Sequence, residues 1–165
     1  MKIILAALTA LSVGLPASAN ISIAFKEGAP KDRIVLSHVG GCLLYDATVV
    51  IDLADSAGNL IFDTEDTGVG VEVFQPLVVE QGANLLAVLP SIEDGATELT
   101  LDVTRMAPGD VITLSTDLDD TMGSREITVS GAEFAGVAVS LMHAGQTAHS
   151  VFSQTPVVTA EIADC

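Results

Sequence analysis

The chain has 165 residues and a formal net charge of −16 at pH 7, because 22 acidic residues face only six lysines and arginines. A surface this negative repels phosphate backbones and anionic lipid surfaces, so we expect no nucleic-acid partner. With no tryptophan and one tyrosine, the chain is short of the aromatic platforms on which sugars stack. This argues against glycosidases and stacking sugar-binding modules. The charge favours cation binding or simply a highly solvated surface.

Residues 1–19 have the features of a secretory signal peptide. Lys2 precedes an apolar run, which ends in the small-x-small sequence of Ala17, Ser18 and Ala19. The run is too short to span a bilayer, which needs about 20 residues. We therefore predict cleavage before Asn20, export to the periplasm or the extracellular medium, and no membrane insertion of the mature form.

Residues 20–165 are enough for one domain, and their apolar residues mostly alternate with a period of two. Turn signals rich in glycine, proline and aspartate separate the alternating runs. We therefore predict an all-β fold of roughly ten short strands, a single β-sandwich of immunoglobulin-like or Greek-key type. The clearest alternating stretches are NISIAF (20–25), TELTLDV (97–103) and REITVS (125–130).

The sequence from Met106 to Val111 predicts a corner between two strands. Pro108 fixes φ at the second turn position and Gly109 takes a positive φ at the third, which is a type II turn. Immunoglobulin-like sandwiches often show a similar apolar-x-Pro-Gly corner. We therefore expect the Met106 side chain to lie between the two sheets.

The two cysteines, Cys42 and Cys165, allow one intramolecular disulfide in an oxidising compartment. Such a bridge would close a long loop and stabilise the fold by roughly 4–5 kcal/mol on the loop-entropy model. The alternative is a two-cysteine zinc site, which no C-x-x-C sequence or neighbouring histidine supports.

Three aspartates crowd the end of one expected strand, at Asp117, Asp119 and Asp120. In a strand, Asp117 and Asp119 project to one side and Leu118 to the core. Calcium takes six to eight oxygens, and the acidic turn 63–66 offers more of them, although the spacing is not that of an EF-hand. The alternative is a solvated strand end whose acids cap the following turn. We expect no required cofactor, and calcium is the candidate ion.

The sequence contains none of the nucleophile or phosphate-loop motifs that would mark an enzyme, so we assign no catalytic residue and expect no enzymatic activity. His38, His143 and His149 are scattered, whereas a zinc or copper site needs three or four converging ligands. We expect these histidines at the surface or in turns.

Four stretches of the chain are informative when taken together. They are FKEGAPKDRIVLSHVGGC (25–42), GVGVEVFQP (68–76), DLDDT (117–121) and REITVSGAEFAG (125–136). They resemble small exported bacterial proteins labelled "aggregation factor core", and the similarity covers the whole mature chain. The label, taken from a sponge proteoglycan, implies extracellular adhesion that depends on calcium in the sponge. The resemblance thus implies an interaction or adhesion-type domain with a protein or cell-surface partner. The alternatives are a structural surface or matrix component without a ligand, and a small secreted hydrolase of unrecognised type.

Overall fold

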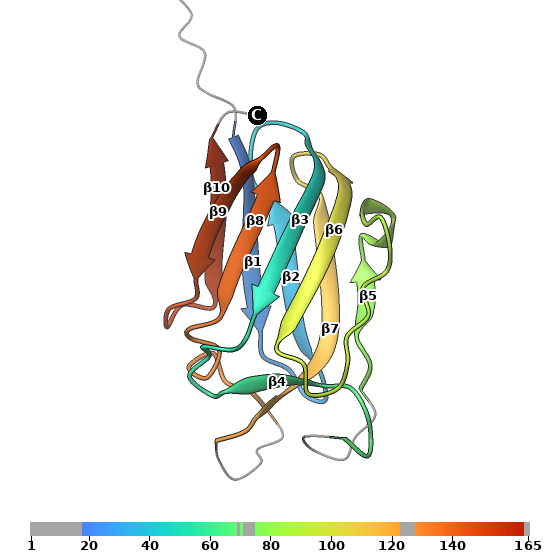
Figure 1. Ribbon diagram of the computed structural model, residues 1–165, viewed down its shortest axis with the longest axis vertical. Helices are drawn as coiled ribbons and strands as arrows, with labels where there is room; N and C mark the ends of the chain where they lie inside the picture. Colours follow the sequence, from blue (N-terminus) through green and yellow to red (C-terminus); the bar gives the residue numbers. More distant parts are fainter. Residues whose placement is uncertain (1–17, 69, 71–74, 123–127, 164–165) are drawn as a thin grey trace, which may run out of the picture.

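The computed structural model describes residues 18–68, 70, 75–122 and 128–163. Their ten strands form two antiparallel sheets packed face to face (Figure 1), which confirms the predicted β-sandwich. Within these ranges the only helical turn is the 3-10 turn η1, Ala83–Leu85. The six-stranded sheet has the order β10 (Val157–Ala163), β1 (Ser18–Lys26), β2 (Asp32–His38), β7 (Val111–Asp120) and β4 (Leu60–Asp63), with β5 (Val78–Gln81) also paired to β7. The four-stranded sheet has the order β6 (Glu98–Met106), β3 (Leu44–Asp52), β8 (Ala138–His143) and β9 (Gln146–Val151).

The core follows the alternation that the sequence predicts. In β1 the side chains of Ile21, Ile23 and Phe25 are at most 3% exposed. In β6 every second side chain from Leu99 to Val103 is buried, while Glu98 and its alternate neighbours face solvent. Each such aliphatic side chain stabilises the fold by about 1.5–3 kcal/mol when it leaves water. Burial of one face of each sheet therefore fixes the strand register.

The strand predicted for residues 125–130 is wrong for the residues of this stretch that the structure describes. Residues 125–127 lie outside the described residues, and Thr128–Ser130 belong to no strand. Ser130 instead begins a turn, because its backbone N and its Oγ both donate to Oε2 of Glu133 at 2.7 Å. Val129 is nevertheless buried, as the alternation suggested.

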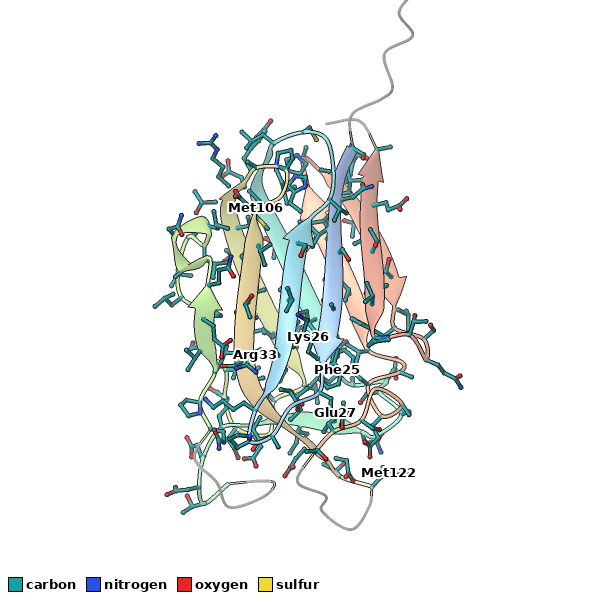
Figure 2. The ribbon with its side chains drawn as sticks, turned by 180° about the vertical axis from the view of Figure 1, so that it is seen from behind. Phe25, Lys26, Glu27, Arg33, Met106 and Met122 are labelled. Carbon is teal, nitrogen blue, oxygen red and sulfur yellow. The ribbon has the colours of Figure 1, made fainter. Side chains whose placement is uncertain are left out.

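The corner between β6 and β7 is confirmed. Gly109 has a φ of +89°, and the amide of Asp110 donates to the carbonyl of Ala107 at 2.9 Å, which closes the turn. Met106 is fully buried between the sheets, at the end of the sandwich opposite to Met122 (Figure 2). The corner thus carries the chain from the four-stranded sheet to the six-stranded sheet.

The predicted cleavage site falls inside β1. Residues 1–17 lie outside the described residues, but Ser18 and Ala19 pair with Ala163 and Ile162 of β10, and Ala19 is fully buried. Cleavage before Asn20 would therefore remove two residues from an internal strand of the sheet.

Cys42 lies at this same end of the sandwich. It is half-buried against the core, and the amide of the preceding Gly41 donates to the carbonyl of Ser18 at 2.9 Å. Cys165 lies outside the described residues, so the Cys42–Cys165 disulfide stays a prediction. The β1–β10 register places Ala163, two residues before Cys165, opposite Ser18.

Candidate cation site

The strand β4 runs across one end of the sandwich and pairs with the last four residues of β7 (Figure 1). Asp63 lies opposite Asp117, and Ile61 lies opposite Asp119. Since cross-strand partners and alternate residues project to the same side, Asp63, Asp117 and Asp119 share one face. Leu118 is buried on the other face with Phe62, as the sequence predicts. The structure thus brings Asp117 and Asp119 together and adds Asp63 to them.

Asp120 does not join this group. Alternation places it on the side of Leu118, and its Oδ1 accepts a hydrogen bond from the amide of Met122 at 3.1 Å. Asp120 therefore caps the turn that follows β7, which is the alternative to a calcium ligand that the sequence left open. In the second acidic turn, Glu65 and Asp66 are exposed to solvent, so Asp63 alone contributes a buried carboxylate.

Asp63 has an environment that is unusual for an ionisable group. Its side chain is fully buried, and neither carboxylate oxygen has a hydrogen-bond partner. Asp119 beside it is 3% exposed. A buried charge without a partner is costly, because the protein interior does not replace its hydration. The arrangement therefore calls for a proton or a cation at Asp63.

Gly70 marks the place where the two buried carboxylates converge. A Cβ built on this glycine would lie 2.7 Å from Oδ2 of Asp63 and 2.7 Å from Oδ2 of Asp119. Both oxygens therefore lie close to the backbone of Gly70. The φ of Gly70 is +121°, a conformation that side chains rarely adopt. Glycine at this position allows the backbone to approach both carboxylates.

The pKa values follow from this crowding. Burial, followed by the charges of Asp119, Asp117 and Asp94, raises the pKa of Asp63 to about 7. Burial, followed by the charge of Asp119, raises the pKa of Asp117 to about 6, against the lowering effect of Lys31. Each shift follows from burial and from the crowding of like charges, both of which disfavour the ionised carboxylates.

The residues present suit a cation that prefers oxygen ligands and receives only a few of them from the side chains of the protein. In the described part of the chain, no group of three or more His, Cys, Asp or Glu side chains could hold a metal ion by itself. Two converging carboxylates, Asp63 and Asp119, are what the end of the sandwich offers, with Asp117 adjacent. A cation bound there would complete its shell with backbone carbonyl oxygens and water.

Asp94 connects this site to the surface. Its Oδ1 accepts hydrogen bonds from the amides of Thr64 at 2.8 Å and Glu65 at 3.2 Å. Thr64 and Glu65 in turn line a groove of about 290 Å³. The other lining residues are largely apolar, and they are Pro76, Leu77, Pro90, Ser91 and Ile92. The carboxylate cluster and the groove therefore share one segment of backbone.

Exposed aliphatic side chains flank this groove in the chain. Val88 and Leu89, directly before Pro90, are 64% and 62% exposed, and Val78, directly after Leu77, is 44% exposed. Isolated exposed aliphatic residues are common on soluble proteins. Here three of them adjoin residues that line one partly apolar groove, which is typical of an interaction surface.

The expected surface positions of the histidines are wrong for two of the three. His38 and His143 are 2% and 3% exposed. His38 continues the buried alternation of Ile34 and Leu36, and its Nδ1 accepts a hydrogen bond from the amide of Gly40 at 3.0 Å. His143 precedes a turn, but its ring packs edge-on against Tyr45. The alternation in β2 was the signal that pointed to a buried His38.

His149 is exposed, and its Nδ1 lies 2.9 Å from Oγ of Ser140. A serine beside a histidine is one element of nucleophilic catalysis. The contact lies on the solvent-facing side of the β8–β9 pair, whereas acyl-transfer sites also need donors for the oxyanion in a space that excludes water. The contact alone therefore gives no support to the hydrolase alternative.

No helix among the described residues has the length and apolar character needed to cross a membrane. No family model matches the chain, and no curated protein matches it. Among solved structures, the chain is similar to two biomass-sensing modules from RsgI-like proteins of Clostridium thermocellum, which are described as resembling the family 3 carbohydrate-binding module of the cellulosome. The first has 13% identity and a TM-score of 0.34 over 78% of this chain and 95% of its own. The second has 7% identity and a TM-score of 0.35 over 84% and 96%. At these TM-scores the likeness carries no argument about function.

Proposed function

We propose that the protein is an exported interaction domain of adhesion type, which binds a segment of a protein or cell-surface partner with the assistance of calcium. The observation that carries the proposal is the partly apolar groove whose wall, Thr64 and Glu65, is held by Asp94 beside the buried carboxylates. The signal sequence at 1–19 and the resemblance to aggregation factor core proteins support export and adhesion.

The chemistry of the groove indicates the kind of partner. Leu77, Ile92 and the two prolines offer an apolar floor, and the exposed Val88 and Leu89 extend it at the surface. The whole chain is strongly acidic, so a partner segment with basic residues around an apolar side chain is complementary in charge. Burial of the apolar side chain supplies affinity, and the charges favour encounter.

Calcium assists through the wall of the groove. Asp63 directly precedes Thr64, and mutual repulsion of Asp63, Asp117 and Asp119 acts on the same segment that Asp94 holds. A cation that neutralises these carboxylates removes that repulsion and fixes the positions of Thr64 and Glu65. The groove is then formed before the partner arrives, which lowers the entropic cost of binding.

The test is binding of the fluorescently labelled protein, residues 20–165, to the surface of cells of the source organism, measured by flow cytometry with calcium or EDTA. We expect binding in calcium that falls at least about tenfold in the Val88→Ser/Leu89→Ser variant, the effect of losing about 1.4 kcal/mol. The matched control is Val151→Ser, since Val151 is 60% exposed on β9 and is not among the residues that line this groove.

Equal loss in the groove variant and in the Val151→Ser control would contradict the assignment of the groove. Absence of any saturable binding, with or without calcium, would favour the structural component without a ligand.

A further inference from the structure

We propose that the outer face of the four-stranded sheet carries a second binding site, which takes one sugar residue of a neutral saccharide. The site is a groove of about 280 Å³ beside the turn between β8 and β9, and we call it the hairpin groove. It is lined by Asp46, Thr48, Met142 and residues 143–147. The groove of the proposed function has none of these lining residues, so the inference goes beyond that function and does not depend on it.

Strand register sets the floor of the hairpin groove. Thr48 of β3 lies opposite Met142 of β8, and Met142 lies opposite Thr147 of β9. Because cross-strand partners project to the same side, the three side chains form one row across neighbouring strands (Figure 1). The adjacent residues Val49 and Leu141 are buried, so this row faces outward. The floor is therefore a thioether with a hydroxyl group on either side.

A hydrogen bond orients the hydroxyl group of Thr48. Its Oγ1 donates to Oδ1 of Asp102 at 3.0 Å, and Asp102 is the cross-strand partner of Thr48 on β6. A hydroxyl group has one proton and two lone pairs, so Oγ1 of Thr48 is left to accept. A hydroxyl group of a bound ligand can therefore donate to it.

Asp46 supplies a carboxylate to the same groove. Its φ of +45° is a conformation that aspartate and asparagine adopt more often than most other residues, and its side chain is exposed. A carboxylate accepts hydrogen bonds from two neighbouring hydroxyl groups and binds them more strongly than a neutral acceptor does. Vicinal hydroxyl groups of a sugar ring present this pair of donors.

Tyr45, the only tyrosine of the chain, lies beside the groove. It directly precedes Asp46, it is 52% exposed, and its ring lies edge-on to the ring of His143 with the centroids 5.2 Å apart. His143 is buried, so its contact limits the movement of the tyrosine ring. An exposed aromatic ring offers apolar surface to the C–H groups of a sugar. The sequence excludes a wide aromatic platform, and this site uses one ring beside a row of hydrogen-bonding groups.

The mixture of groups favours a saccharide over a basic protein segment. Each sugar hydroxyl both donates and accepts, which suits two threonine hydroxyl groups and a carboxylate around a thioether. A lysine or arginine side chain presents donors alone and is best matched by several carboxylates. Among the described residues that line the hairpin groove, Asp46 alone is acidic.

Charge and size narrow the ligand further. The net charge of −16 disfavours saccharides that carry carboxylate or sulfate groups. The groove volume of about 280 Å³ is close to the lower limit of small-molecule pockets, about 300 Å³. The hairpin groove therefore suits one sugar residue of a neutral chain.

The experiment is saturation-transfer NMR of the protein comprising residues 18–165, which include the whole of β1. The probes are the neutral disaccharides cellobiose, maltose, lactose and N,N′-diacetylchitobiose and the anionic digalacturonic acid, all in EDTA. We expect at least one neutral disaccharide to bind with a dissociation constant on the order of 10⁻³ M, because a small open groove buries little of its ligand. Digalacturonic acid should bind more weakly than that disaccharide.

Two pairs of variants locate the binding. Asp46→Asn keeps a residue that tolerates a positive φ and removes the charge, so it should weaken binding about fivefold. Its matched control is Asp55→Asn, an exposed aspartate beyond the other end of β3, which should bind as the wild type does. Tyr45→Ala should weaken binding roughly threefold to tenfold, whereas Tyr45→Phe keeps the ring and should bind as the wild type does. Both altered positions are exposed, and circular dichroism checks that each variant is folded.

Failure of every neutral disaccharide to bind would overturn the site. So would equal binding by Asp46→Asn, Tyr45→Ala and Asp55→Asn. If decalysine binds at the hairpin groove and no disaccharide does, the ligand is a basic protein segment and the saccharide assignment is wrong. Val88→Ser/Leu89→Ser should bind the disaccharide as the wild type does, so loss of cell-surface binding in that variant bears only on the proposed function.

Discussion

Asp63 and Asp117 lie directly opposite each other in the β4–β7 pair, so two acidic side chains occupy one cross-strand site. Like charges at such positions destabilise a sheet. Here the destabilisation is increased by burial, which, together with neighbouring carboxylates, raises the pKa of Asp63 to about 7. Neutralisation of this pair by a proton or by a cation should therefore stabilise the protein.

Gly70→Ala should abolish the response to calcium. The added methyl group would lie 2.7 Å from carboxylate oxygens of both Asp63 and Asp119, so that both side chains would have to move. With the strain of a φ of +121°, this should lower the melting temperature in EDTA by roughly 3–10 °C and remove the calcium-induced rise. Melts in EDTA and in calcium measure both effects.

The control for Gly70→Ala is Gly145→Ala. Gly145 also has a positive φ, +76°, but a Cβ there would meet no atom within 4 Å. This variant should be destabilised by backbone strain and should keep the calcium-induced rise. An equal calcium response in the two variants would contradict the role given to Gly70.

Asp32→Asn should stabilise the protein at about pH 8 and have little effect at about pH 4. Asp32 is 1% exposed, and burial raises its pKa from 3.8 to about 7, although its Oδ1 accepts a hydrogen bond from the amide of Gly28. Because the folded-state pKa lies above the unfolded value, stability is full below about pH 4 and is lost as the pH rises through about 7. Asparagine keeps the acceptor for Gly28 and carries no charge.

The measurement is the denaturation midpoint of both proteins in EDTA between about pH 4 and pH 8. Glu98→Gln, which changes an exposed carboxylate on β6, is the control and should follow the wild type. A constant difference between Asp32→Asn and wild type across this range would show that Asp32 does not titrate as the structure indicates.

The native protein should contain no free thiol, because Cys42 and Cys165 are expected to form a disulfide with Cα atoms about 4.4–6.8 Å apart. The pairing of Ser18 with Ala163 and the contact of Gly41 with Ser18 place the neighbours of both cysteines at one end of the sandwich. Cys42→Ser should lower the free energy of unfolding by roughly 2–5 kcal/mol. Two thiols titrating in unreduced, natively purified protein would refute the pairing.

The exported protein should begin at Asn20, and it should fold without Ser18 and Ala19. Those two residues contribute one buried alanine and two register pairs with β10, whereas Ile21, Ile23 and Phe25 hold β1 in the core. A form beginning at Ser18 should therefore be more stable by roughly 1–2 kcal/mol. Intact mass of the secreted protein gives the start, and an exported product that retains Met1 would refute cleavage.

Alternation along single strands could be read from the sequence, which is why the inward faces of β1 and β6 and the position of Leu118 were predicted. The Met106 corner was predicted for a similar reason, since proline and glycine fix the turn locally. The turn at Ser130 was missed because a side-chain hydrogen bond to Glu133 competes with an alternating pattern that suits a strand.

The composition of the cation site could not be read from local sequence. Asp63 and Asp117 are brought together by the register of two strands far apart in the chain, and no local pattern specifies that register. The acidic turn 63–66 offered three acids, and only the structure shows that Asp63 is buried while Glu65 and Asp66 are exposed. Asp120 was wrongly grouped with Asp117 and Asp119 because it is next to them in the sequence. Successive side chains of a strand project to opposite faces of the sheet, so Asp120 lies on the other face.

The pairing of β1 with β10 has a practical consequence for how the molecule can be attached. Ser18 and Ala163 lie side by side at one end of the sandwich, and β4 crosses the other end (Figure 1). A bead, a fluorophore or a carrier protein joined beyond Ala163 would thus stand a full strand length away from the groove and the carboxylates. Immobilisation through that end would present every molecule in the same orientation, with the carboxylate cluster directed outward.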